Sequence, residues 1–296
     1  MLRKFTYQIT SENENRTIGE YLRKHGYSHH MLALLKRTEN GILRNGAWTR
    51  TSQPLYTGDL LAVRLEENIS SPGISPVPME LSIVYEDQDI LVLNKPADTR
   101  VHPSIHNHEN TLANGILWYY EQQGIPFVCR FINRLDRDTS GLLIIAKHML
   151  SGTVLSSDMK ERRIHRTYLA IVKGLIREPG TVDAPIARKE GSALERCISF
   201  ETGERAVTHY EPLVCRQDLN LTLLALRLET GRTHQIRIHM GYLGHPVIGD
   251  YLYYPDRTQI GRQALHSWKL EFLHPITKER LIFEAPLPED MKFILC

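Results

Sequence analysis

A run of five apolar residues at positions 142–146 constrains the fold of this chain most, because it directly follows a polar, charged turn. A short continuous apolar run bounded by turn residues is typical of a strand buried on both faces. Residues 138–141, Asp-Thr-Ser-Gly, favour tight turns. Asp136 lies just before them, between Arg134 and Arg137, and nearby guanidinium groups favour the charged form of a carboxyl group. The pattern predicts a carboxylate at the entrance to a buried strand, which suits nucleophilic chemistry and is also compatible with ordinary turn structure.

Residues 134–141 resemble the active-site motif of the RluA-type family of RNA pseudouridine synthases. Three further parts resemble motifs of the same family in the expected order, namely residues 93–96 with 101–103, 166–174 and 230–239. The resemblance covers residues 80–290. The family more often has His at the position of Asn133, and it usually has Gly at the position of Asp98. Because Asp tolerates left-handed backbone better than most residues, we expect the turn at Asp98 to be retained.

The resemblance implies a pseudouridine synthase that acts on structured RNA, either ribosomal or transfer RNA. Converting uridine into its carbon-linked isomer requires cleavage of the glycosidic bond, rotation of the uracil and formation of a bond to its carbon 5. The reaction needs an anionic group beneath the sugar, a platform for the detached base and a group that takes a proton. It includes no redox step and no phosphoryl transfer, so we expect no cofactor and no metal.

The resemblance also implies roles for three catalytic residues. Asp136 is the expected nucleophile, Arg232 the partner that keeps it ionised and oriented, and Tyr168 the ring that stacks on the target base. Asp138 is the rival acid, and we expect it to bond to the backbone of the turn. An exposed Arg at a helix start and a Tyr in a strand are also common without any catalytic role.

Arg134 and Arg237 are the expected RNA contacts near the site. In the family, the position of Arg134 helps to hold the strand from which the target nucleotide is flipped, and unstacking a base costs roughly a few kcal/mol. Arg237 is expected to contact a further phosphate. Histidines are frequent around positions 102–108, but no Cys, Asp or Glu beside them has a standard metal-ligand spacing.

Residues 1–66 are predicted to form a small basic domain, with ten Lys and Arg against six Asp and Glu. Apolar spacing between residues 18 and 35, interrupted at Gly26, predicts two short helices, and Asn45-Gly46 predicts a hairpin before a strand at residues 60–63. This order resembles the αL RNA-binding module of a ribosomal small-subunit protein. The residues expected to contact phosphates are Arg23, Lys24, Lys36, Arg37 and Arg44. A solvated helical face would show the same residues.

Residues 67–79 contain three prolines with Gly and Ser, so we expect an extended, mobile linker that lets its two neighbours reorient. Residues 80–296 form the predicted catalytic domain, in which strands outnumber helices. The strands are expected at residues 81–85, 90–93, 166–172, 207–213, 221–228, 264–272 and 281–285, and the helices at 111–120 and 150–159. The predicted fold class is α+β, with a mixed, mostly antiparallel sheet flanked by helices, as in pseudouridine synthases.

The composition is ordinary for a globular protein, with 42% hydrophobic and 24% charged residues. The N-terminus lacks the apolar core of a signal peptide, no apolar run can span a bilayer, and the four cysteines show no paired spacing. We therefore expect a cytoplasmic monomer with RNA as its partner and no membrane association. Two other interpretations stay open. One is a non-catalytic RNA-binding or ribosome-assembly protein on the same scaffold, and the other is a glycoside or nucleoside hydrolase, which needs a second, suitably placed acid.

Overall fold

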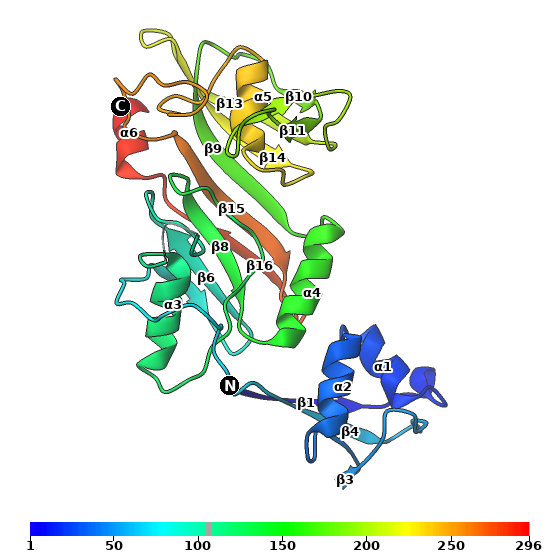
Figure 1. Ribbon diagram of the computed structural model, residues 1–296. Coiled ribbons are helices and arrows are strands. Elements are labelled where there is room, and N and C mark those ends of the chain that lie inside the picture. Colours follow the sequence, from blue (N-terminus) through cyan, green and yellow to red (C-terminus); the bar gives the residue numbers. More distant parts are fainter. Residues whose placement is uncertain (105–107, 296) are drawn as a thin grey trace.

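The computed structural model describes residues 1–104 and 108–295, so His106, one of the histidines around positions 102–108, lies outside the described residues. The chain forms a small N-terminal part and a larger part built on one long sheet (Figure 1). The six-helix, mostly β architecture agrees with the predicted α+β class within this described range. None of the helices described is long and apolar enough to cross a membrane.

The N-terminal part contains an antiparallel sheet in the order β1-β4-β2-β3 with two helices. Ser28 caps the second helix by accepting a hydrogen bond from the backbone N–H of Met31. The two helices and the hairpin at Asn45-Gly46 are as predicted, but β1 was not predicted, although Phe5 and Tyr7 alternate with polar residues along it. The elements are β1 (Leu2–Gln8), a 3-10 turn (Ser11–Asn13), α1 (Ile18–Lys24), α2 (His29–Arg37), β2 (Ile42–Arg44), β3 (Ala47–Trp48) and β4 (Leu60–Glu66).

The long sheet has the order β10-β13-β14-β9-β15-β8-β6-β5, with β16 paired to β15 and β7 paired to β8. Among the described strands of this sheet, β15 and β8 pair in parallel, and every other pair of neighbouring strands is antiparallel. The predicted mixed, mostly antiparallel sheet is thereby confirmed. Its strands are β5 (Ile83–Glu86), β6 (Ile90–Lys95), β7 (Arg130–Phe131), β8 (Ser140–Ala146), β9 (His165–Lys173), β10 (Gly180–Asp183), β13 (Val207–Arg216), β14 (Leu221–Leu228), β15 (Leu265–Leu273) and β16 (Arg280–Glu284). A separate pair consists of β11 (Ile186–Arg188) and β12 (Arg196–Ile198).

The centre of this sheet is buried on both faces because helices cover each side. Along β6, Leu91 and Leu93 join the core cluster that contains α3, whereas Ile90 and Val92 join the cluster that contains Leu155 of α4. All residues of β8 are buried, as its continuous apolar run predicts. The covering helices are α3 (Leu112–Glu121), α5 (Gln235–Tyr242) and α6 (Glu289–Leu295) on one face and α4 (Met149–Lys160) on the other.

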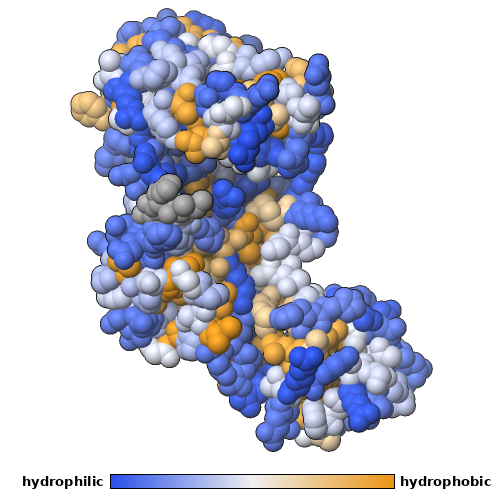
Figure 2. All heavy atoms as spheres, viewed as in Figure 1, coloured by the Kyte–Doolittle hydropathy of each residue, from blue (hydrophilic) through white to orange (hydrophobic). Residues whose placement is uncertain are grey.

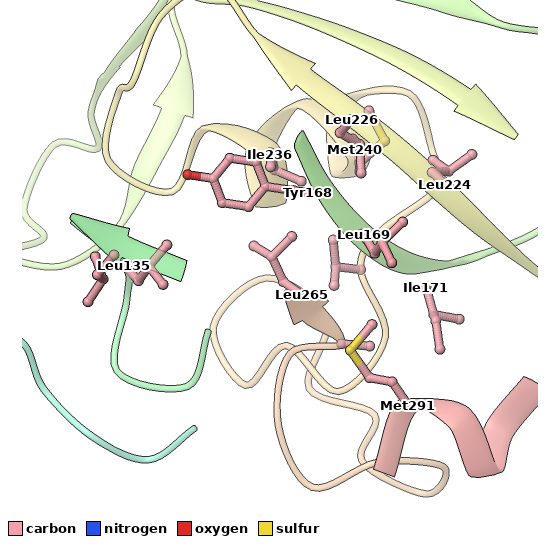
Figure 3. Close-up of a cluster of buried hydrophobic side chains, with 14 of the residues drawn as sticks. Leu135, Tyr168, Leu169, Ile171, Leu224, Leu226, Ile236, Met240, Leu265 and Met291 are labelled. Atoms are coloured by element: carbon pink, nitrogen blue, oxygen red, sulfur yellow. The ribbon is translucent and has the colours of Figure 1, made fainter. Parts of the chain in front are cut away.

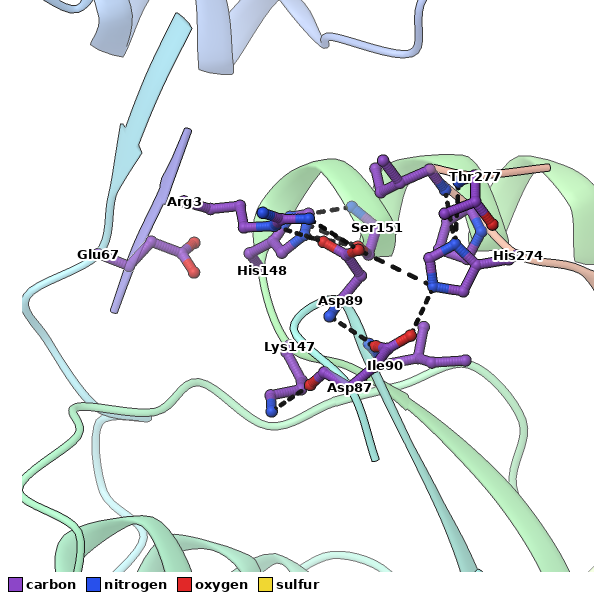
Figure 4. A network of polar contacts seen from close by, with 12 residues as sticks. Arg3, Glu67, Asp87, Asp89, Ile90, Lys147, His148, Ser151, His274 and Thr277 are labelled. Atoms are coloured by element: carbon purple, nitrogen blue, oxygen red, sulfur yellow. Dashed lines mark hydrogen bonds and ion pairs between the residues drawn. The ribbon is translucent and has the colours of Figure 1, made fainter. Parts of the chain in front are cut away.

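An ion pair joins the N-terminal part to the long sheet. Arg3 of β1 donates two hydrogen bonds to the carboxylate of Asp89, at 2.7 and 3.1 Å, and His148 contacts the same carboxylate at 2.8 Å (Figure 4). Burial would raise the pKa of Asp89, but the hydrogen bonds from His148 and Arg3 hold it below its usual value. Leu150 of α4 adds an apolar contact by joining the core of the N-terminal part.

The segment of residues 67–79 is extended but is fixed along the larger part. Backbone N–H groups of Ser71 and Val77 donate to the carbonyls of Phe127 and Asn114, and the Asn114 side chain donates to the carbonyl of Ser75. These bonds differ from the expected mobile linker. The reason is that the serines and the backbone of this segment find polar partners around α3.

Gly141 begins the buried strand at the point where β8 pairs with β15. Its φ is +110°, and a β-carbon there would lie 2.2 Å from the carbonyl oxygen of Ser267. A side chain at this position would therefore force β8 and β15 apart.

We predict that Gly141→Ala lowers the free energy of unfolding by about 3 kcal/mol or more, because it combines an unfavourable φ with overlap against backbone atoms. Gly124→Ala is the matched control. Its φ is +67° but no atom lies within 4 Å of the added β-carbon, so the expected loss is about 1 kcal/mol. Urea denaturation measures both variants, and equal losses would contradict the proposed importance of the β8–β15 contact.

Candidate active site

Asp136 lies at the entrance to β8, and its side chain is 30% exposed. Its carboxylate oxygen Oδ2 accepts a hydrogen bond of 3.0 Å from Nη1 of Arg237. Nε2 of His234 lies 3.8 Å from the same oxygen. Within the described residues, the other oxygen, Oδ1, has no hydrogen-bond partner, so it is the oxygen that a substrate can approach.

A second carboxylate holds Arg237 in place. The guanidinium, which is 1% exposed, donates to Asp250 through Nε at 2.6 Å and Nη2 at 2.7 Å. The rings of Tyr251 and Tyr253 lie beside it, with centroids 5.7 and 5.0 Å from Cζ. Burial would lower the pKa of Arg237, but the hydrogen bonds and charges of Asp250 and Asp136 outweigh burial and raise it. Arg237 is therefore a buried, charged group shared by two carboxylates.

The structure corrects two predictions about arginines. Arg232, expected to pair with Asp136, forms an ion pair with Glu204 and donates to the carbonyl of Arg205 at 3.2 Å. Arg237, expected to contact a phosphate, is buried and makes the pair with Asp136 instead. The physical reason is the position of α5. Arg232 lies in the loop before this helix, whereas Arg237 belongs to its residues 235–240, all of which are buried.

Asp136 opens onto a small pocket that brings together the five predicted residues of the larger part. They are Arg134, Asp136, Tyr168, Arg232 and Arg237. Leu228 and Leu265 add an apolar wall. Tyr168 lies at the edge of a buried cluster, with its hydroxyl directed away from Leu226 and Met240 (Figure 3). An aromatic ring beside a partly exposed carboxylate suits a planar, uncharged base.

Asp138, the rival acid, is engaged elsewhere. Its carboxylate is buried and accepts two hydrogen bonds of 3.0 Å from the guanidinium of Arg137. This bidentate pair differs from the expected bond between Asp138 and the turn backbone, because the neighbouring arginine reaches both oxygens. Asp136, and not Asp138, lines the pocket.

The two departures from the family pattern have local explanations. Asn133 is buried, donates from Nδ2 to the carbonyl of Leu142 at 3.2 Å and accepts from the backbone N–H of Ile144 at 2.9 Å. It thereby ties the loop to β8 with both ends of its amide. Asp98 has φ +56°, so the left-handed turn is retained as expected.

Lys95, to which the sequence analysis assigned no catalytic role, holds the turn that carries Asp136. Its buried ammonium donates to the carbonyls of Pro96, Thr99 and Arg137 at 2.7, 2.9 and 2.8 Å. Burial lowers the pKa of Lys95 to about 7, although nearby carboxylates oppose the shift. Because Arg137 directly follows Asp136, Lys95 fastens the turn that carries the carboxylate to the end of β6. A Lys inside an otherwise apolar strand was the available signal.

One further group has metal-ligand spacing among the described residues. Ligand atoms of Asp87, Asp89 and His274 lie within 4.8 Å of one another. Asp89 already accepts hydrogen bonds from Arg3, and His274 contacts Asp87 at 2.9 Å. These contacts neutralise the group without an ion, and we assign it to the junction with the N-terminal part.

The five cations predicted to form one RNA-binding face do not line one common pocket. Arg23 and Lys24 line a groove facing α4, whereas Lys36 and Arg44 line a second pocket beside Trp48, which is 63% exposed. Arg37 lines neither of these two. Arg44 also donates to the carbonyl of Pro54 at 2.7 Å. RNA binding by these five residues stays a prediction.

Comparison with known proteins places this site in a family. A family model described as RNA pseudouridylate synthase matches residues 89–242, which include every predicted residue of the pocket. An uncharacterized RNA pseudouridine synthase of Bacillus subtilis, YjbO, is 42% identical over 94% of this chain and 98% of its own length. Ribosomal large subunit pseudouridine synthase D of Xylella fastidiosa is 37% identical over 84% of this chain and 78% of its own.

The solved structure titled human RNA pseudouridylate synthase domain containing 1 aligns with a TM-score of 0.57 at 30% identity, over 70% of this chain and 83% of that chain. This chain belongs to the RNA pseudouridine synthase family. The predicted fold and enzyme class are thereby confirmed, and the chain is an isomerase that converts uridine in RNA into pseudouridine.

We predict that removing the carboxylate partners of the two arginines has very different effects on stability. Asp250→Ala should lower the free energy of unfolding by about 3 kcal/mol or more, because it strands a buried charge. Glu204→Ala, which removes the exposed partner of Arg232, should cost less than about 0.5 kcal/mol. Chemical denaturation measures the free energy of unfolding of both variants. Similar losses would contradict the assignment of Arg237, and not Arg232, as the buried arginine.

Proposed function

We propose that this chain isomerises specific uridines of ribosomal RNA and that Asp136 is its nucleophile. The substrate is supported by relatives named ribosomal large subunit pseudouridine synthase D, which are 37% and 39% identical over most of this chain. Transfer RNA is the second candidate substrate. The observation that carries the catalytic role is the Asp136 carboxylate, held at one oxygen by Arg237 and available at the other beside a pocket.

The proposed reaction is an internal exchange of bonds at one nucleotide. The bond between sugar carbon 1′ and base nitrogen 1 breaks, the uracil turns, and carbon 1′ bonds to carbon 5 of the same base. The proton on carbon 5 leaves and nitrogen 1 takes up a proton, so no atom or electron is gained or lost. Asp136 supplies the anionic oxygen that the cleaved intermediate requires, and Arg237 orients it through a charge-assisted hydrogen bond.

Tyr168 and Arg134 complete the proposed recognition of the nucleotide. The ring of Tyr168 stacks on the base, and Arg134, exposed at the rim of the pocket, contacts the strand from which the base is flipped. Arg232 lies at the same rim and is a further candidate contact to RNA. Neither cofactor nor metal takes part in this scheme.

The proposed domain roles follow the sequence boundaries. Residues 1–66 act as an RNA-binding domain, residues 67–79 connect it, and residues 80–296 carry out catalysis. The exposed cations Arg23, Lys24, Lys36 and Arg37 support the first assignment. We propose that the protein works as a monomer in the cytoplasm, where its RNA substrate is found.

Cells that carry Asp136→Asn should lose pseudouridine at one or a few positions of ribosomal RNA, because the amide cannot act as an anionic nucleophile. Chemical adduct mapping with primer-extension stops detects the change. Asp218→Asn is the matched control, since it removes an exposed carboxylate that does not line the pocket and should leave every stop in place.

If all stops persist with folded and expressed Asp136→Asn protein, the nucleophile assignment fails. Loss of stops in transfer RNA alone would replace the proposed substrate. Wild-type protein that binds RNA and changes no nucleoside would favour the non-catalytic alternative, and release of free uracil would favour a hydrolase.

A further inference from the structure

A groove runs between the N-terminal part and α4, and its lining includes Arg3, which pairs with Asp89. Its lining comes from β1, from the end of α1 and the following loop, from α4 and from residues 275–278. Figure 2 shows the molecule hollowed where the N-terminal part meets the rest. The groove has a volume of about 770 Å³, within the range of about 300–1,000 Å³ typical of ligand sites.

The charge on this groove is strongly positive. Five exposed cations line it; Arg163 pairs with Asp158, and the other four are Lys4, Arg23, Lys24 and Lys278. Within the described residues, none of the four has a carboxylate oxygen within 4.0 Å. Asp158 is the acid in the lining, and its carboxylate already accepts a 2.8 Å hydrogen bond from Arg163. The groove therefore presents cations that no acid of its lining neutralises.

The two walls are held at a fixed separation. Arg3 anchors β1 to Asp89 through two hydrogen bonds. Leu150 of α4 is part of the core of the N-terminal part, and a β-carbon on Gly26 would lie 2.7 Å from Val154. Because the groove is formed before any partner arrives, binding there loses little conformational entropy.

The chemistry of the lining favours a phosphate backbone over bases or apolar groups. Phe5 and Tyr27 are buried and offer no exposed ring for stacking. The exposed ring of His25 lies against Tyr21, with ring centroids 4.2 Å apart, so one of its faces is already covered. Thr6 adds an exposed hydroxyl group, which can donate to a phosphate oxygen.

We propose that this groove binds the phosphate backbone of structured RNA and that residues of both the N-terminal part and the larger part contact it. The inference rests on the proposed function, since it takes RNA as the substrate, and it assigns to the groove an RNA segment outside the target nucleotide. The groove lining shares no residue with the pocket of Asp136.

The test compares two triple variants of the full chain that change net charge equally. Lys4, Lys24 and Lys278 become Gln in the groove variant, and Lys189, Lys269 and Lys292 become Gln in the control variant. The control lysines lie outside the groove, each paired with a glutamate on the surface. The probe is a fluorescently labelled RNA hairpin, titrated at several salt concentrations and followed by anisotropy.

The groove variant should bind at least about tenfold more weakly. The slope of its plot of log affinity against log salt concentration should become less negative by about 2, as expected when phosphate contacts are lost. The control variant should change affinity by less than about threefold. Equal weakening of both variants, which is a general effect of net charge, would overturn the groove assignment, and so would unchanged binding by the groove variant.

Pseudouridine formation by the wild-type chain is measured in parallel. If the wild type forms none, the proposed function fails, and the groove inference is then tested only by RNA binding of the groove and control variants. If the wild type forms pseudouridine while the groove variant binds RNA unchanged, the groove inference fails and the proposed function stands.

Discussion

A buried arginine shared by two carboxylates is the interaction on which this site depends. An unpaired guanidinium could not be buried at acceptable cost, so Arg237 requires Asp250, and the remaining hydrogen-bonding capacity of Arg237 fixes Asp136. Asp250 is itself fixed, because its oxygen Oδ1 accepts the backbone N–H groups of Leu252 and Tyr253. The orientation of the Asp136 carboxylate thus depends, through Arg237, on the turn at Asp250, which lies more than a hundred residues further along the chain.

The long sheet supplies the rigid frame for this arrangement. Asp136 lies where β8 begins, Tyr168 lies on β9 and Arg237 lies in α5, so elements far apart in sequence meet at one edge of a packed core. Lys95 and Gly141 secure the turn from both sides, one through three carbonyls and the other by allowing the approach of β15. Functional loops held by rigid strands are a common solution, because precise positions need a scaffold that does not yield.

Strong local patterns made much of the fold predictable. The apolar run after Asp136 identifies a central strand, and the spacing at residues 150–159 identifies α4. Strand β1 was missed because its alternating pattern covers only residues 4–8, and its pairing with β4 is found only in the folded chain. The linker was misjudged for a similar reason, since its composition allows mobility while the partners that hold it are found only in the folded chain.

The site, like the fold, could be predicted only where a local pattern determines it. The motif points to Asp136, but it does not say which arginine faces it, because residues 235–240 are buried all round and carry no apolar stripe to orient the helix. His234 has φ +58° before α5, and Asp250 lies thirteen residues beyond Arg237. Both features depend on tertiary packing, so family resemblance and spacing alone favoured Arg232.

The most direct test of this account is the single-turnover rate of tritium release from ribosomal RNA labelled at carbon 5 of uridine. The variants are Arg237→Lys and Arg232→Lys, each shown by circular dichroism to be folded. Lysine keeps the charge but loses the fork that binds two carboxylates. The account predicts that Arg237→Lys slows release by at least about 100-fold, or about 2.7 kcal/mol. Arg232→Lys should slow it by less than about threefold. The opposite ranking would show that Arg232, and not the buried Arg237, controls the catalytic carboxylate.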